Sequence, residues 1–169
     1  MWASWLWCGV CWDAGDERGG YSKMGMERMN EPKVMDEMLG DGPARAGKAR
    51  TIAVVGLSEN PAKPSHYVSE YMQRHGYRIY PVNPVVESVL GEKSYASLKE
   101  LPTRPDVVNV FRLPAAIPAI VDEMLELGLK DLWVQQGIVN LEAAERAEQG
   151  GIRVVMDRCI MVEHRRRML

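Results

Sequence analysis

The distribution of apolar residues divides the chain near residue 50. Beyond it, short apolar runs alternate with segments in which apolar residues recur every three or four positions. These patterns predict strands at 51–56, 77–82, 106–111, 130–135 and 152–156, and helices at 65–75, 114–127 and 141–149. The strands are apolar throughout rather than alternating, which is typical of strands that are buried on both faces.

This order of elements predicts an α/β fold, a three-layer, Rossmann-like, doubly wound parallel sheet of about five strands. Strands and helices that alternate through short connections are the pattern of βαβ units. The connection 85–105 is expected to be irregular, with a short helical piece around 97–101. After the fifth strand, 157–169 is expected to form a loop and a short basic tail.

The segment before the first strand has a different composition. Residues 1–45 are expected to be a disordered N-terminal extension with one short helix near 33–39, because glycines and polar residues interrupt every apolar run. Translation that starts at an internal methionine, such as Met24 or Met26, would shorten this extension. The domain itself is expected to span 46–164, with 165–169 as the tail.

Two features of the extension invite a functional interpretation. Four of the five tryptophans lie in its first twelve residues, together with the C-x-x-C pair Cys8 and Cys11. The pair lacks the βαβ context of a thiol redox motif and a second pair of zinc ligands. We therefore predict no metal site.

Charge and cysteine content narrow the function classes. The 21 Lys and Arg residues are balanced by 23 Asp and Glu residues, so the cationic excess of a nucleic-acid-binding protein is missing. No apolar run approaches the roughly 18 residues that span a bilayer. Three cysteines and no recognisable secretion signal fit a cytoplasmic location.

In an open α/β sheet, a ligand binds beyond the carboxyl ends of the strands. The first of these ends carries Gly56, but Ser58 and Pro61 occupy the other two glycine positions of a dinucleotide fingerprint. Asn83 stands where an acidic residue would hold the ribose of NAD. Both departures count against an NAD site. Ser58, Lys63 and the N-terminus of the helix opened by the N-cap Ser65 still offer groups for a phosphate, although a plain surface turn has the same residues.

Five strand-end motifs together resemble the family of small CoA-binding proteins, which are similar to the nucleotide-binding domain of the succinyl-CoA synthetase alpha chain. The resemblance covers roughly residues 50–164, and its motifs follow one another in the expected order. They are Val55-Gly-Leu-Ser-Glu-Asn-Pro-Ala-Lys-Pro-Ser65, Tyr80-Pro-Val-Asn-Pro84, Asp106-Val-Val-Asn-Val-Phe-Arg112, Trp133-Val-Gln-Gln-Gly137 and Val155-Met-Asp-Arg-Cys159.

The resemblance implies coenzyme A as the ligand and assigns residues to its parts. Gly56, Ser58 and Lys63 would line the phosphate end, where the family commonly has Arg in place of Lys63. The helix that begins at Ser65 would face these phosphates. The remaining implied contacts are Val82, Asn83 and Pro84 around the adenosine, Phe111 and Arg112 along the pantetheine or nucleotide channel, and Gln136 and Gly137 on its far side.

Few residues suggest catalysis. Cys159 lies beside Arg158 at the ligand edge; it either forms a mixed disulfide with the CoA thiol or packs as a small buried side chain. His66 is a candidate phosphate contact, His75 a candidate helix cap, and His164 belongs to the expected solvated tail. No Ser/His/Asp set or pair of carboxylates can be assigned.

The sequence therefore predicts a CoA-binding or acyl-CoA-binding protein without catalysis of its own, acting as a carrier, sensor or regulatory module. A homodimer or a protein partner would fit this role, whereas nucleic acid and membrane would not. Three alternatives stay open: an accessory subunit of an acyl-CoA ligase-type enzyme, an NAD(P)-binding redox-sensing module, and a scaffold that docks through its apolar N-terminus.

Overall fold

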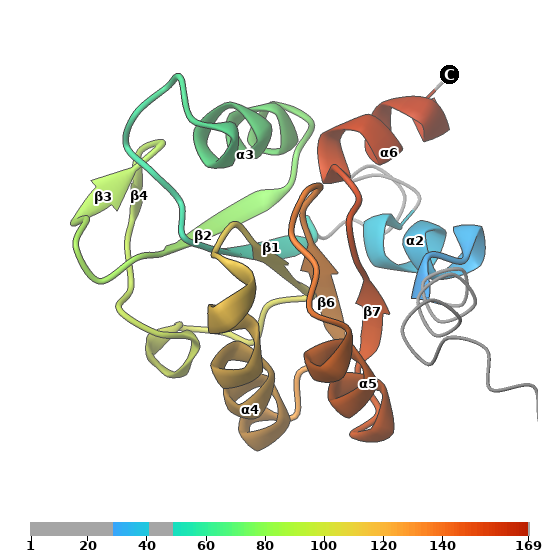
Figure 1. Cartoon of the computed structure of the whole chain (residues 1–169). Coiled ribbons are helices and arrows are strands. Elements are labelled where there is room, and N and C mark those ends of the chain that lie inside the picture. Colours follow the sequence, from blue (N-terminus) through green and yellow to red (C-terminus); the bar gives the residue numbers. More distant parts are fainter. Residues whose placement is uncertain (1–28, 41–48, 169) are drawn as a thin grey trace, which may run out of the picture.

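The fold is built on one parallel sheet (Figure 1). We analysed a computed structural model that describes residues 29–40 and 49–168. Five strands pair in the order β2-β1-β5-β6-β7. Their bounds are β1 Thr51–Val55, β2 Arg78–Val82, β5 Val107–Val110, β6 Asp131–Val134 and β7 Arg153–Val155.

Helices cover both faces of this sheet, as Figure 1 shows. One face carries α4 (Ile117–Leu127) and α5 (Leu141–Gln149), and the other carries α3 (Pro64–Arg74) and α6 (Ile160–Met168). The helix α4 is preceded by a 3-10 turn, η2 (Pro114–Ala116). The predicted three-layer, Rossmann-like α/β fold is thus confirmed.

The apolar strands follow from this two-sided cover. All five residues of β1 are buried; Ile52 and Val54 pack into the core beneath α3, while Ala53 and Val55 pack into the core beneath α4. Trp133 in β6 is fully buried on the α3 side and donates its indole N–H to the carbonyl of Arg158 at 2.8 Å. Strands with two buried faces have no position for a polar side chain unless it finds a partner.

The order of the strands creates a switch point between β1 and β5. From β1 the chain runs through α3 to β2 on one side, and then returns to place β5 on the other side of β1. The connections at the carboxyl ends of β1 and β5 therefore diverge, and in open α/β sheets this is where ligands bind.

The connection 85–105 is more regular than expected. It contains a two-stranded hairpin, β3 (Ser88–Val89) with β4 (Glu92–Lys93), and a 3-10 turn η1 (Leu98–Glu100). The two hairpin-turn residues, Leu90 and Gly91, both have positive φ. Strands of two residues are too short for an alternating pattern to show in the sequence.

The expected loop and basic tail at 157–169 is wrong for residues 160–168. They form α6, in which Glu163 and His164 are buried, so His164 is not a solvated residue. Glu163 accepts hydrogen bonds from Arg166 and Arg167, each at 2.9 Å. The helix was missed because, after Ile160, its buried residues Glu163 and His164 are polar, and apolar periodicity therefore gives little signal.

Part of the expected extension is integrated into the fold. The helix α2 (Pro32–Leu39) packs beside β7, and its Met35, Met38 and Leu39 are buried. Asn30 exchanges two hydrogen bonds with the backbone of Met156, at 2.9 and 3.0 Å. Cys8, Cys11 and the N-terminal tryptophans lie outside the described residues. No helix of the described part has the length and apolar character needed to cross a membrane.

Candidate functional site

The ends of β1 and β5 touch at the switch point. Gly56 has φ of 89°, and its N–H donates to the carbonyl of Val82 at 2.9 Å. A Cβ at this position would lie 2.8 Å from Cδ of Arg112 and 3.1 Å from the carbonyl oxygen of Phe111. Glycine is needed here both for its conformation and for the close approach of the Arg112 side chain.

The loop between β1 and α3 is braced by its own hydroxyl groups. The backbone N–H of Ser58 donates to Oγ of Ser65 at 3.1 Å, and Oγ of Ser58 accepts the N–H of Asn60 at 3.2 Å. The Nδ1 atom of His66 lies 2.9 Å from the carbonyl oxygen of Ser58. These bonds hold the loop in one shape beside the ends of β1 and β5.

The expectation that Ser65 caps α3 is wrong. Lys63 occupies the N-cap position, Pro64 begins the helix, and Ser65 lies within the first turn with its hydroxyl turned back to the loop. Proline suits the first helical position because its fixed φ fits there.

The N-terminus of α3 consequently offers few donors. Pro64 has no N–H, and the N–H groups of His66 and Tyr67 donate to the carbonyl of Lys63 at 2.9 and 3.2 Å. Recognition of an anion at this edge would therefore depend more on side-chain cations than on helix N–H groups. Lys63 and Arg112 are both exposed there.

Asn83 ties three segments together at the end of β2. Its side-chain amide donates to the carbonyl of Leu57 at 2.9 Å, and its side-chain oxygen accepts the N–H of Val85 at 3.3 Å. Its backbone N–H donates to Tyr95 at 2.8 Å. The amide is thus occupied by backbone groups on both its donor and its acceptor side.

The end of β6 forms a tight turn. The N–H of Ile138 donates to the carbonyl of Gln135 at 3.1 Å, and Gly137 has φ of 82°. Its N–H donates to Oδ1 of Asp157 at 2.7 Å. Asp157 belongs to the fifth strand-end motif of the sequence, but the motif assigned it no role.

The other candidate residues lie at the same edge but differ in access. Val82 is buried at the end of β2, and Pro84 is exposed beyond it. Phe111 and Cys159 are half-buried and pack against the apolar cluster on the α3 side. Cys159 is a free thiol. Gln136 is exposed.

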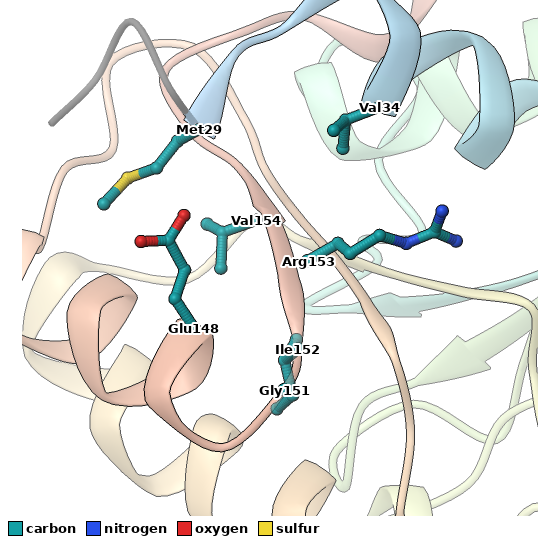
Figure 2. A pocket seen from close by; sticks show the side chains of 7 residues that line it. All are labelled: Met29, Val34, Glu148, Gly151, Ile152, Arg153 and Val154. Carbon is teal, nitrogen blue, oxygen red and sulfur yellow. The ribbon is translucent and has the colours of Figure 1, made fainter. Parts of the chain in front are cut away.

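A separate cavity of about 260 Å³ lies at the β7 edge, away from these strand ends (Figure 2). It sits beside the start of β7 and the end of α5, and its lining residues are Met29, Val34, Glu148, Gly151, Ile152, Arg153 and Val154. Among residues 29–40 and 49–168, no group of His, Cys, Asp and Glu side chains is arranged to hold a metal ion.

The chain is similar to known proteins over most of the described domain. The chain is 46% identical over 117 residues to the uncharacterized protein YneT of Bacillus subtilis, covering 69% of this chain and 87% of YneT. It is 29% identical to the subunit alpha of an ADP-forming acetate–CoA ligase of Pyrococcus furiosus, but it spans only 27% of that protein.

A solved structure is similar to this chain over most of the length of both proteins. A Thermus thermophilus protein described as cell-free ID.343 superposes with a TM-score of 0.72 and 37% identity, covering 81% of this chain and 98% of that one. Residues 50–165, which contain all five strands and every strand-end loop described above, match the model of the family described as "CoA binding domain". The chain therefore belongs to the CoA-binding domain family.

Proposed function

We propose that this protein binds CoA or an acyl-CoA at the carboxyl edge of its sheet and catalyses no reaction by itself. It would serve as a carrier, sensor or regulatory module. The observation that carries the proposal is the switch point. There the exposed side chain of Arg112 packs closely over Gly56, and the exposed Lys63 lies at the end of the loop that Gly56 begins, in a chain of the CoA-binding domain family.

The chemistry of the ligand fits these groups. CoA carries a pyrophosphate and a separate ribose phosphate, which are strong acceptors for lysine and arginine side chains. Lys63 at the N-cap of α3 and Arg112 beyond β5 would meet these anions. Gly56, Ser58 and Ser65 would shape the β1–α3 loop, since the hydroxyl groups of both serines accept hydrogen bonds from its backbone.

The rest of the ligand would extend over the neighbouring strand ends. Val82, Asn83 and Pro84 would flank the adenosine, while Phe111, Gln136 and Gly137 would border the pantetheine arm, with Cys159 packed below. Two aliphatic side chains at this rim, Val85 and Leu113, are 86% and 79% exposed, and a bound ligand would cover apolar surface there.

The geometry favours CoA over NAD(P). An NAD site uses a carboxylate after the second strand to accept the ribose hydroxyls. Here Asn83 stands at that point, and its side-chain oxygen already accepts the N–H of Val85.

Thermal unfolding with added ligands tests the proposal. We expect CoA to raise the melting temperature, by mass action on the folded state, while NAD and NADP leave it unchanged. Lys63→Ala and Arg112→Ala should each reduce the CoA-induced shift. Lys130→Ala, which removes an exposed lysine next to the amino end of β6, is the matched control and should keep it. A wild-type protein that responds to NAD but not to CoA would refute the proposal.

A second candidate function is that of an accessory subunit of an acyl-CoA ligase-type enzyme. The similarity to a ligase subunit alpha favours it. The protein alone, supplied with ATP, acetate and CoA, should form no acetyl-CoA under either proposal. Formation of acetyl-CoA only after a nucleotide-binding ligase subunit is added would favour the accessory role over the non-catalytic one.

A further inference from the structure

We infer that Asp157 is a positioning residue, which holds the Gln136–Gly137 peptide in the one orientation that the CoA site uses. The inference rests on the proposed function. In that site, Asp157 would hold the turn after β6 in place rather than contact the ligand itself.

Asp157 has a backbone conformation that needs a reason. Its φ is 58°, in the left-handed region that non-glycine residues seldom adopt. Among the described residues only Leu90 shares this property, and Leu90 lies in the β3–β4 hairpin turn, where positive φ is part of the turn. No such turn surrounds Asp157, and strain of this kind persists where the surrounding structure enforces it.

The residues on both sides of Asp157 provide that enforcement. Met156 is held through its backbone by the side chain of Asn30, at 2.9 and 3.0 Å. The carbonyl of Arg158 accepts the indole N–H of the buried Trp133 at 2.8 Å. With the backbone on both sides held in place, the side chain of Asp157 points toward the turn after β6.

The partner of Asp157 in that turn is the N–H of Gly137, which Oδ1 accepts at 2.7 Å. Gly137 has φ of 82°, the Gln135–Ile138 bond closes the turn, and Gln136 is not among the residues with positive φ. Together these features define a type II turn, whose central peptide is rotated by about half a revolution relative to type I.

The bond therefore decides which way the central peptide points. Since the carbonyl and the N–H of a trans peptide point in opposite directions, an N–H held by Asp157 directs the carbonyl of Gln136 away from the β7–α6 loop. Without the acceptor, the turn can rotate this peptide, and the exposed end of β6 would present a different pattern of donors and acceptors.

Three substitutions separate the bond from the strain. Asp157→Gly removes the acceptor and relieves the backbone, and because these two effects on stability oppose each other, the protein should remain folded without ligand. Its Kd for CoA should nevertheless rise about tenfold, the effect of losing one charge-assisted bond. Asp157→Asn keeps an acceptor and tolerates positive φ, so its Kd should stay within about twofold of wild type. Gly137→Ala should weaken binding like Asp157→Gly. A Cβ at Gly137 meets no atom within 4 Å, so its effect comes from φ alone.

Leu90→Asn is the matched control. It eases positive φ at a residue outside the site, and it should leave the Kd for CoA unchanged. Hydrogen exchange of the Gly137 amide, followed by NMR without ligand, gives a second measurement. We expect protection in wild type and Asp157→Asn, and faster exchange in Asp157→Gly.

The outcomes distinguish the two proposals. A wild-type protein that does not bind CoA overturns the proposed function, even if the Gly137 amide exchanges as expected. If wild type binds CoA and Asp157→Gly binds it equally well, the positioning role is wrong. The same holds if Asp157→Asn binds as weakly as Asp157→Gly, because charge rather than the bond to Gly137 would then be responsible.

Discussion

Gly56 shows at the scale of one residue how tightly the fold constrains the site. It combines a positive φ with the close approach of Phe111 and Arg112, so a side chain there would cause both backbone strain and a steric clash. Gly91 in the β3–β4 turn also has positive φ, but a Cβ there would meet no atom within 4 Å. The pair allows strain and steric conflict to be measured separately.

We predict that Gly56→Ala lowers the free energy of unfolding by about 2–4 kcal/mol, whereas Gly91→Ala lowers it by about 1 kcal/mol. The difference reflects the displacement of Arg112, and it should be accompanied by a reduced response to CoA. Urea unfolding of both variants measures the two costs. Equal costs would show that Arg112 moves aside freely.

His164 is a buried histidine whose protonation opposes folding. Burial, the neighbouring His75 and the cation of Arg167 lower its pKa below the ordinary value of 6.5. It lies among aromatic rings from α3 and the start of β2, with Tyr71, His75 and Tyr77 at centroid distances of 5.6, 5.2 and 5.5 Å. Its Nδ1 lies 3.0 Å from the hydroxyl of Tyr71, and its buried Nε2 has no hydrogen-bond partner.

The sign of the pH effect follows from this shift. The unfolded chain binds a proton at His164 near pH 6.5 while the folded protein still resists it, so acid favours unfolding. The penalty is absent above about pH 6.5 and grows until the pH reaches the lower pKa of the folded state. We predict that stability to urea falls as the pH drops below about 6.5, and that His164→Asn reduces this fall.

Tyr71→Phe serves as the control for that experiment. It removes the hydroxyl that contacts His164 but keeps the ring, so it should lower stability by about 1 kcal/mol at neutral pH while the acid-dependent fall remains, because burial of His164 is unchanged. An unchanged slope in His164→Asn would mean that another group causes the acid sensitivity.

At the scale of elements, α2 acts as a cover for the β7 edge. Its Met38 is fully buried, the hydroxyl of Tyr77 donates to the carbonyl of Leu39 at 2.8 Å, and burial raises the pKa of Tyr77 to about 12. Ion pairs join Glu37 to Arg153 and Asp36 to Arg167. Since both pairs are partly exposed, apolar burial contributes more than charge.

We therefore predict that Met38→Ala lowers the free energy of unfolding by about 2–3 kcal/mol, the usual cost of truncating a buried methionine. Lys33→Ala, at an exposed position of the same helix, should change it by less than about 0.5 kcal/mol. Chemical denaturation distinguishes the two. If both variants unfold like wild type, α2 contributes little to the stability of the domain.

At the scale of the whole molecule, the packed core extends beyond the residues that match the family. The match covers 50–165, whereas the core also takes in Met29, Met35, Met38 and Leu39. Removing these side chains would uncover the buried face beside β7 and leave the side chain of Arg153 without its partner Glu37.

A pair of shortened chains tests this larger unit. A chain that begins at Met26 retains every described contact of α2 and should keep the melting temperature and the CoA response of the full chain. A chain that begins at residue 49 should melt at a lower temperature, because it exposes apolar surface that was buried. If the shorter chain melts at the same temperature, α2 is not part of the cooperative unit.

Apolar pattern by itself determined the parallel sheet, because a strand covered on both faces needs apolar residues at every position. The strands at 51–55, 107–110 and 131–134 fall inside the predicted ranges for this reason. The helix 141–149 matches its predicted range because its apolar residues recur at helical spacing. The strand-end motifs also indicated which edge of the sheet carries the candidate site, since parallel strands bring their carboxyl ends to one side.

Tertiary structure alone decided the features that depend on partners distant in sequence. α6 packs through the buried His164 against Tyr71 of α3, 93 residues earlier in the chain, and its mostly polar buried face gave no apolar period. The short helix expected near 33–39 is present as α2, but only the tertiary structure showed that it packs beside the edge strand β7. The roles of Asn83, Ser65 and Asp157 are of the same kind. In the sequence, Asn83 and Ser65 were plausible ligand contacts and Asp157 was a motif residue without a role. Only the structure shows which backbone group each side chain binds, because a hydrogen bond depends on position in space rather than on residue type.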